Sequence, residues 1–225
     1  HKGIIANPNC STIIMVMALK PIYDLAKIKR VIVSTYQAVS GAGKEGIDEL
    51  DAQVREHSEG REMTANILPS ASAEKHYPIA FNLIPQIDVF CDNLYTKEEM
   101  KMVNETKKIM EDYEMRITAT TIRVPVYRSH SESVNIELEK EVDLGAMREA
   151  LAKFPGVTVQ DDPSKQEYPM PLYTSEKDDV YVGRLRRDES CEKSYNMWVV
   201  GDQMFQGQVG YDALKQAIAK ARKEG

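Results

Sequence analysis

The sequence is poor in cysteine and histidine, the residues that most often build disulfide frameworks and zinc sites. Its three cysteines, Cys10, Cys91 and Cys191, lie far apart, and no pair has CxxC spacing. Such an odd, sparse set argues against a disulfide-stabilised fold and favours a reducing, cytoplasmic compartment. The four histidines are scattered and none pairs at metal-ligand spacing, so we expect no metal site.

Long apolar runs and an excess of positive charge are also missing. No stretch approaches the roughly 20 apolar residues of a membrane span, and we expect no signal peptide. The formal net charge of -6 argues against binding nucleic acid or an anionic membrane through the overall field. The chain has 225 residues, 42% of them hydrophobic and 28% charged, which is typical of a soluble globular protein that buries a core.

Hydrophobic patterns predict that helices and strands alternate. The apolar run from Ile13 to Leu19 is too dense for a surface helix and predicts a buried one, kinked or ended by Pro21. The stretch Thr96-Lys97-Glu98-Glu99 is a capping box that opens an amphipathic helix through Glu111. Other helices are expected at 44–57, 143–154 and 212–223, and strands at 30–37, 116–127, 134–138, 157–159, 180–186 and 196–200.

These elements predict an α/β (α+β) fold with a mixed, largely antiparallel sheet and helices on one face. The strands at 116–127 and 134–138 are expected to be neighbours in that sheet. The connections 60–77 and 161–178 are expected to be loops.

Cys10 follows a turn and opens the first predicted helix. Backbone N–H groups and the helix dipole there favour an anion, so we expect a stabilised thiolate, alkylated in preference to Cys91 and Cys191. The same N–H groups can hold an oxyanion at an attacked carbonyl. The alternative is a buried structural cysteine.

Two other residues are candidates for chemistry. His130 lies at a junction between two strands, where it can act as general acid and base; otherwise it is an exposed loop histidine. Arg123 falls within a strand and needs a partner. That partner is either a substrate carboxylate held by two hydrogen bonds or an acidic side chain of the protein.

The stretch Gly41-Ala42-Gly43-Lys44-Glu45-Gly46 matches the GxGxxG dinucleotide fingerprint. It follows the predicted strand only after residues 38–40, so the turn is not tight, and no second buried parallel strand is recognisable at 60–70. We therefore do not interpret it as a dinucleotide site.

Three motifs together are more specific than any single residue. They are Asn7-Pro8-Asn9-Cys10-Ser11-Thr12, Val33-Ser34-Thr35-Tyr36-Gln37-Ala38-Val39-Ser40-Gly41-Ala42-Gly43, and Ile122-Arg123-Val124-Pro125 followed by His130-Ser131-Glu132. In residues, order and spacing they resemble bacterial aspartate-semialdehyde dehydrogenases, from residue 1 to about Val200.

The resemblance implies a division into domains. In that family an N-terminal domain binds NADP, and the next domain carries the catalytic groups and most of the dimer contact. Its fold is like the C-terminal domain of glyceraldehyde-3-phosphate dehydrogenase-type enzymes. We expect 1–200 to be this catalytic and dimerisation domain and 201–225 a C-terminal helix of it, in a cytoplasmic homodimer.

The reaction implied is reductive dephosphorylation of β-aspartyl phosphate to aspartate semialdehyde and phosphate, for lysine, methionine and threonine synthesis. By resemblance, Cys10 attacks the acyl carbonyl and forms a thioester. Gln37 orients the intermediate, and His130 acts as acid and base. The backbone N–H groups of Asn9 and Cys10 form the oxyanion hole.

The resemblance also implies binding residues. Arg123 holds the substrate α-carboxylate, Glu98 meets the amino group and Lys101 meets phosphate. Glu98 and Lys101 are three apart on a helix, so both can face one site; without the family, a solvated surface pair is the plainer interpretation. Ser40, Gly41 and Gly43 border the nicotinamide of NADP.

Two departures from the family pattern concern the cofactor. The chain opens on His1-Lys2-Gly3 and lacks most of the NADP domain, including its phosphate-binding arginine. After Val200 it continues as Gly201-Asp202-Gln203-Met204, so Gln203 replaces an asparagine that would help place the nicotinamide. We interpret the chain as a domain cut from a longer enzyme and resurfaced, with design as a hypothesis. We expect no NADPH formation by the chain alone in a spectrophotometric assay.

Other functions stay open at this stage. One is a non-catalytic dimeric scaffold or engineered truncated domain, which the divergent C-terminus supports. Another is a cysteine-dependent hydrolase using Cys10, His130 and Gln37, although nothing in the sequence indicates water activation. The related N-acetyl-glutamyl-phosphate reductases use a similar cysteine and histidine, but Tyr36 to Gly43 favours the aspartyl enzyme.

Overall fold

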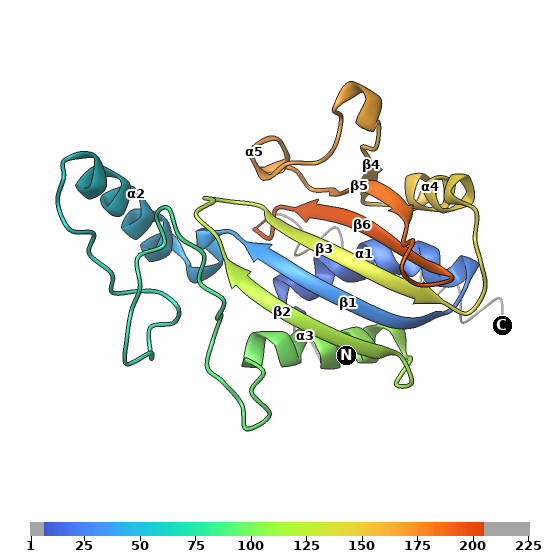
Figure 1. The fold of residues 1–225 in the computed structure, drawn as a ribbon, viewed down its shortest axis with the longest axis horizontal. Coiled ribbons are helices and arrows are strands. Elements are labelled where there is room, and N and C mark those ends of the chain that lie inside the picture. Colours follow the sequence, from blue (N-terminus) through green and yellow to red (C-terminus); the bar gives the residue numbers. More distant parts are fainter. Residues whose placement is uncertain (1–6, 205–225) are drawn as a thin grey trace.

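A six-stranded mixed sheet organises the chain in the computed structural model, which describes residues 7–204 (Figure 1). The strand order is β2-β1-β3-β6-β5-β4. The two outer pairs, β2 with β1 and β5 with β4, are parallel, and the three inner pairs are antiparallel. The strands are β1 (Ile28–Gln37), β2 (Arg116–Arg123), β3 (His130–Leu138), β4 (Val157–Val159), β5 (Val180–Arg187) and β6 (Ser194–Gly201).

The expected pairing of the strands at 116–127 and 134–138 is wrong, because β1 lies between β2 and β3. β2 also ends earlier than predicted, at Arg123. Pro125 has no N–H to continue a ladder, and the chain turns beside the segment that follows β1. There Val124 N–H donates to Gln37 O, Val39 N–H to Val126 O, and Ser40 N–H to Tyr127 O. These hydrogen bonds hold residues 37–40 against the segment that follows β2.

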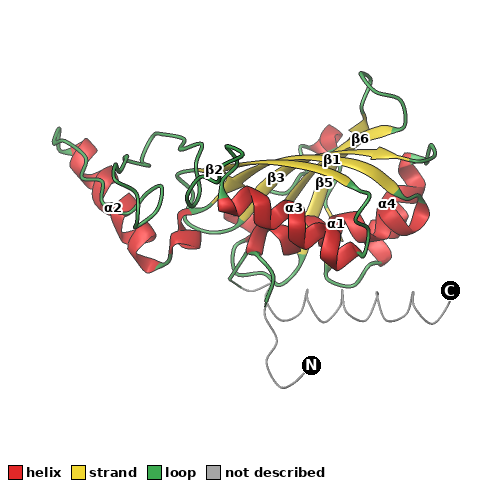
Figure 2. Cartoon of the chain, turned by 90° about the horizontal axis from the view of Figure 1, so that it is seen from below, coloured by secondary structure: helices red, strands yellow, loops and turns green. Residues whose placement is uncertain are grey.

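Three helices cover one face of the sheet, as predicted, whereas α2 (Lys44–Ser58) lies beyond its end (Figure 2). They are α1 (Cys10–Leu25), α3 (Lys97–Met110) and α4 (Leu144–Lys153). Helix α1 is buried for most of its length, because its apolar side chains surround the helix rather than forming a stripe. Pro21 does not end it: the helix continues to Leu25, and Ile22 on the next position is fully buried.

The opposite face of the sheet carries no long helix in the part of the chain that the structure describes (Figure 2). Part of it is covered by the connection from β4 to β5, a predicted loop that contains η2 (Pro163–Lys165) and the short helix α5 (Pro171–Thr174). Trp198 on β6 donates to Pro169 O, 3.1 Å away. Further along, Ile32 on β1 is 36% exposed. We call this surface the open face.

Helix α2 (Lys44–Ser58) stands beyond one end of the sheet (Figure 1). It packs on η1 (Val39–Ala42), a short 3-10 turn after β1, and shares a small core with residues 67–84. The buried Gln53 amide holds this lobe together by donating to Thr64 O and accepting from the N–H groups of Ile79 and Ala80. The GxGxxG stretch thus opens a helix that lies beyond the end of the sheet.

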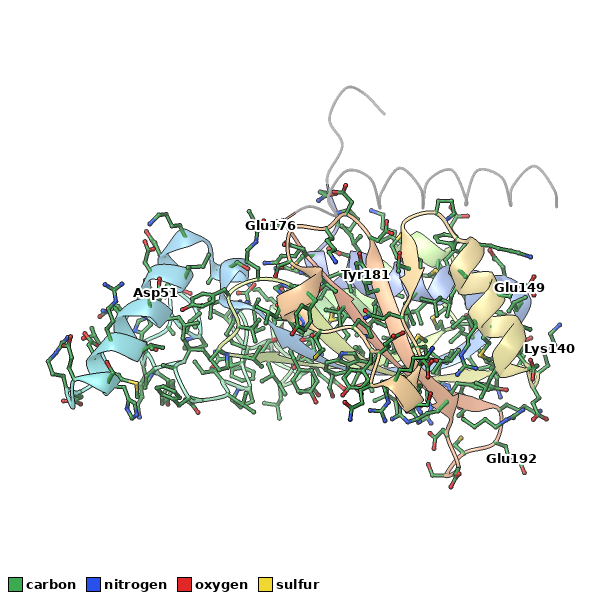
Figure 3. All side chains as sticks on the ribbon, turned by 90° about the horizontal axis from the view of Figure 1, so that it is seen from above. Asp51, Lys140, Glu149, Glu176, Tyr181 and Glu192 are labelled. Atoms are coloured by element: carbon green, nitrogen blue, oxygen red, sulfur yellow. The ribbon has the colours of Figure 1, made fainter. Side chains whose placement is uncertain are left out.

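One hydrogen bond ties helix α2 to the segment that follows β2. Tyr127 Oη donates to Asp51 on α2 at 2.5 Å. Figure 3 shows Asp51 at one end of the molecule and Glu192, in the β5–β6 connection, toward the other. Residues 1–6 and the predicted helix at 212–223 lie outside the described residues. No helix among those described is long and apolar enough to cross a membrane.

The cap at the N-terminus of α3 can be tested by its effect on the stability of the protein. This helix carries two candidate site residues, Glu98 and Lys101. Thr96 accepts from Glu99 N–H at 3.2 Å, and Glu99 accepts from Thr96 N–H at 2.8 Å, which forms the predicted capping box. We expect Thr96→Ala to lower the free energy of unfolding by about 1 kcal/mol, measured by urea titration, because one helix donor loses its cap. Thr96→Ser keeps the hydroxyl and should restore stability. Equal stability of all three proteins would contradict the assignment.

Candidate functional site

Cys10 is the first residue of helix α1. Asn9 caps the helix: its Oδ1 accepts from Thr12 N–H at 3.0 Å. An asparagine is a preferred N-cap because its short side chain satisfies a helix donor that has no partner within the helix. The cap fixes where the Cys10 side chain leaves the helix.

His130 is the first residue of β3 and lies beside this sulfur. Its Nε2 is 3.4 Å from Cys10 Sγ. On the other side of the ring, Ala38 N–H donates to Nδ1 at 3.1 Å. His130 is fully buried, so the alternative of an exposed loop histidine is excluded.

Arg123 ends β2 and faces the same site from the neighbouring strand. Its Nη1 donates to Ala38 O at 2.7 Å, so the backbone of Ala38 is hydrogen-bonded to both Arg123 and His130. Gly41 closes over them: a Cβ there would lie 2.6 Å from Arg123 Nη1 and 3.3 Å from His130 Cε1. Only glycine lets the turn after β1 approach this closely.

Glu98, on the first turn of α3, connects the remaining predicted residues. Its Oε1 accepts from Asn9 Nδ2 at 2.8 Å and from Gln37 Nε2 at 3.4 Å. Its Oε2 lies 3.4 Å from Lys101 Nζ, which also pairs with Asp88 at 3.3 Å. The Glu98–Lys101 pair therefore lies at the site and is not a solvated surface pair, although Lys101 keeps 45% of its side chain exposed.

One part of the expected oxyanion hole is wrong. Asn9 N–H donates to Glu105 Oε2 at 2.7 Å, so it does not point at a reacting oxygen. Of the two expected donors, the Cys10 N–H stays a candidate. The sequence analysis missed Glu105, although it lies four residues after Lys101 on the same face of α3 and helical spacing could have identified it.

The electrostatics of the pair differ from the expected stabilised thiolate. Burial and then the nearby Glu98 raise the pKa of Cys10 to about 11, and these effects outweigh hydrogen bonding from Ser11 and the charge of Arg123. Burial and then Arg123 lower the pKa of His130 to about 3. At neutral pH both groups are therefore uncharged in this structure. The reason given for preferential alkylation of Cys10 does not hold here.

The predicted cofactor-side residues separate into two groups. Ser40 and Gly41 lie at the site: Ser40 Oγ accepts from Gln203 Nε2, and a Cβ on Gly41 would meet Arg123 and His130. Gly43 N–H donates to Ser40 O at 3.0 Å, and Gly43 precedes α2 with a φ of 82°. A Cβ added at Gly43 would meet no atom of the described residues within 4 Å. The space beside Gly43 is therefore open, and its cofactor role stays a prediction.

The turn that presents His130 is held by residues that the sequence did not indicate. Ser129, at a φ of 72°, is buried and bonds through its hydroxyl to Thr174 Oγ1 of α5 at 2.6 Å. Arg128 pairs with the buried Asp202 at 3.2 Å and with Glu176 at 2.9 Å. Such long-range partners have no local sequence signal. Among the described residues, no group of three or more metal-binding side chains is arranged to hold a metal ion.

The effect of Glu98 on Cys10 can be measured directly. We expect Glu98→Gln to lower the Cys10 pKa and raise its alkylation rate at pH 8 severalfold, because the charge is lost while an amide oxygen remains to accept from Asn9. The readout is site-resolved mass spectrometry after iodoacetamide treatment over a pH series, with Cys91 as internal reference. In the unchanged protein the Cys10 rate should keep rising up to about pH 11. A plateau already present near pH 7 would show that the thiol is ionised and refute this electrostatic account.

Comparison with known proteins adds family and fold information. Residues 19–206 match the family described as semialdehyde dehydrogenase, dimerisation domain. The aspartate-semialdehyde dehydrogenase of Aquifex aeolicus is 53% identical over 206 residues, 92% of this chain and 59% of that protein. That of Bacillus subtilis is 51% identical over 208 residues, 92% of this chain and 60% of that protein. The chain thus spans about three-fifths of the length of these relatives.

Solved structures agree with the fold. The crystal structure of aspartate semialdehyde dehydrogenase II from Vibrio cholerae matches with a TM-score of 0.85 and 42% identity, covering 96% of this chain and 62% of that one. A second structure is that enzyme complexed with ASA, with the same similarity. The enzyme from Candida albicans with NADP matches in fold alone, with a TM-score of 0.65 and 23% identity over 98% of this chain and 58% of that one.

Proposed function

The chain belongs to the semialdehyde dehydrogenase family, whose dimerisation domain it carries, and on that premise we propose that it supplies the catalytic groups of an aspartate-semialdehyde dehydrogenase. The reaction is the reductive dephosphorylation of β-aspartyl phosphate to aspartate semialdehyde. The observation that carries the proposal is the 3.4 Å approach of Cys10 Sγ to His130 Nε2, with Arg123 and Glu98 beside them.

The proposed first step is acyl transfer to Cys10. The sulfur attacks the acyl carbonyl, a carbon–sulfur bond forms, and the carbon–oxygen bond to phosphate breaks. Gln37 donates to Glu98, whose charge acts on Cys10, and in this proposal Gln37 orients the thioester. The Cys10 N–H stabilises the oxyanion. The family resemblance assigns acid and base catalysis to His130.

Substrate binding falls to Arg123, Glu98 and Lys101. Arg123 uses Nη1 for Ala38 O, but its buried Nε has no hydrogen-bond partner among the described residues. A buried guanidinium donor without a partner is costly, and a substrate carboxylate satisfies it. Glu98 has the charge to meet an ammonium group, and the exposed Lys101 is placed to meet phosphate at the mouth of the site.

The residues present also fit a nicotinamide cofactor. Gln203 donates to Ser40, and its Oε1 is buried without a partner among the described residues, so it can accept from a carboxamide N–H. Gly41, which has no side chain, leaves a flat surface over Arg123 and His130. NADP, when bound, supplies or accepts the hydride. Ser40, Gly41, Gly43 and Gln203 would border its ring.

A homodimer is part of the proposal, with the open face as the contact. This face includes the exposed Ile32 together with Ser133 and Trp198 on the neighbouring strands. A groove of about 370 Å³ lies beside Trp198 and is lined also by Arg184 and Arg186. Side chains of a partner can fit into this concave surface. An exposed sheet face that no long helix covers is the kind of surface that association can bury.

The non-catalytic scaffold is the less favoured alternative. A scaffold has no need for a thiol and an imidazole in contact inside a buried cluster, and such clusters are typical of active sites. The reducing, cytoplasmic location stays a prediction from cysteine usage.

The acyl-transfer step can be tested without NADP. Mixing the chain with β-aspartyl phosphate should release phosphate in a burst of up to one equivalent per chain and leave a thioester on Cys10, seen by mass spectrometry. Cys10→Ser should abolish the burst, and Arg123→Lys should slow it at least tenfold because the carboxylate loses a fork-shaped partner. Cys191→Ser is the matched control and should leave the burst intact. A burst that persists in Cys10→Ser would refute the proposal.

The dimer contact has its own test. Ile32→Glu should convert a dimer into monomers, because it replaces an apolar side chain of the open face with a charge. Val54→Glu changes a similarly exposed residue on α2, 39% exposed against 36% for Ile32, and should leave the mass unchanged. Light scattering measures both, with circular dichroism to verify folding. A folded Ile32→Glu dimer would place the interface elsewhere.

A further inference from the structure

Most of the backbone N–H groups at the start of α1 already have a partner. The first four N–H groups of a helix have no acceptor within the helix, and here they belong to residues 9–12. Asn9 N–H donates to Glu105 Oε2 at 2.7 Å, and Thr12 N–H donates to Asn9 Oδ1 at 3.0 Å. Ser11 N–H acts on the Cys10 sulfur. Among the described residues, only the Cys10 N–H of these four has no acceptor.

Glu105 determines which of these donors stays free. It reaches Asn9 from α3, 96 positions away in the sequence, so the contact depends on how the two helices pack. A backbone N–H that donates to a carboxylate forms a charge-assisted hydrogen bond, which is stronger than a neutral one. We infer that Glu105 is a positioning residue: it takes up the Asn9 N–H, fixes the first turn of α1 and leaves the Cys10 N–H as the donor for the reacting oxygen.

A second glutamate of α3 holds the same asparagine. Glu98 Oε1 accepts from Asn9 Nδ2 at 2.8 Å. Glu98 and Glu105 are about two turns apart and therefore lie on one face of the helix. The two carboxylates hold Asn9 by its side chain and by its backbone, while Asn9 Oδ1 caps α1. An amide suits this position because it donates to Glu98 and accepts from Thr12 N–H at the same time.

The two glutamates act on Cys10 in different ways. After burial, the charge of Glu98 raises the pKa of Cys10, and the charge of Arg123 lowers it. Glu105 is not among the groups whose charges act most on this thiol. Its effect on Cys10 therefore passes through the backbone of Asn9, the residue that precedes the nucleophile.

The role in the reaction rests on the proposed function. During acyl transfer the carbonyl oxygen gains negative charge and needs a donor. An oxyanion at the Asn9 N–H would lie against the Glu105 carboxylate, and like charges at that distance repel each other. The Cys10 N–H is the donor that remains, next to the attacking sulfur. Acid and base catalysis stays with His130.

Amide hydrogen exchange, followed by NMR of the ¹⁵N-labelled chain, tests the pairing without any turnover. The Asn9 amide should exchange roughly tenfold more slowly than the Cys10 amide, which has no acceptor. Glu105→Ala should remove this difference, whereas Glu105→Gln, whose amide oxygen can still accept, should keep most of it. Asn104→Ala changes an exposed neighbour on α3 and should leave the Asn9 rate unchanged. An Asn9 amide that exchanges as fast as that of Cys10 in the unchanged protein would overturn the inference.

The phosphate burst separates positioning from substrate binding. Glu105→Ala should lower the burst rate at saturating β-aspartyl phosphate by roughly tenfold and leave the half-saturating concentration within about twofold, because the nucleophile is misplaced while the substrate contacts remain. Glu105→Gln should recover the rate to within about threefold. Glu105→Asp keeps the charge on a shorter side chain and should lose rate like Glu105→Ala, so it replaces that variant if circular dichroism shows that the alanine protein does not fold. Asn104→Ala is again the control.

Three results would contradict a positioning role. They are a full burst rate in Glu105→Ala, a change confined to the half-saturating concentration, and a Glu105→Gln protein as slow as Glu105→Ala. The pH dependence of Cys10 alkylation should also be the same in Glu105→Gln as in the unchanged protein, unlike that expected for Glu98→Gln, and a shift would mean that Glu105 acts through its charge. The exchange rates report on the pairing even if the unchanged protein gives no burst, so the two proposals can fail separately.

Discussion

The backbone around Ala38 is the constraint on which the site geometry depends. It accepts from Arg123 on one side and donates to His130 on the other, and it leads directly into the turn that closes over both residues. Three strands meet there: β1 ends just before Ala38, β2 ends at Arg123 and β3 begins at His130. The sheet order, with β1 between the other two, is what allows a single backbone segment to reach both side chains.

Opposing electrostatic effects act on the ionisation of the Cys10 thiol. The start of a helix favours a negative charge, and Arg123 adds a positive neighbour, yet burial and Glu98 outweigh both in the described structure. The site therefore holds a protonated thiol beside a neutral imidazole. Binding an ammonium group against Glu98 would change that balance in the direction of the thiolate, since it neutralises the charge that opposes ionisation.

Local sequence signals predicted a good part of this structure. The capping box at Thr96 and the dense apolar run after Cys10 are encoded by adjacent residues, so the helices could be recognised directly. The pairing of β2 with β1 instead of β3 depends on contacts across the whole domain, and no local pattern contains it. For the site, the family resemblance named Cys10, Arg123 and His130, which lie together in the structure. It could not reveal that Glu105 occupies the Asn9 N–H or that burial suppresses the charges, because both depend on tertiary packing.

The separation of 120 positions between Cys10 and His130 in the sequence has a kinetic consequence. Contacts of such large sequence separation are slow to form, since the intervening chain must lose its freedom before they contribute any stability. The thiol at the start of α1 can thus be ordered on its helix well before the strand that carries its imidazole is in position. A nascent or partly unfolded chain would expose this cysteine to oxidants, and completion of the central sheet is what encloses it.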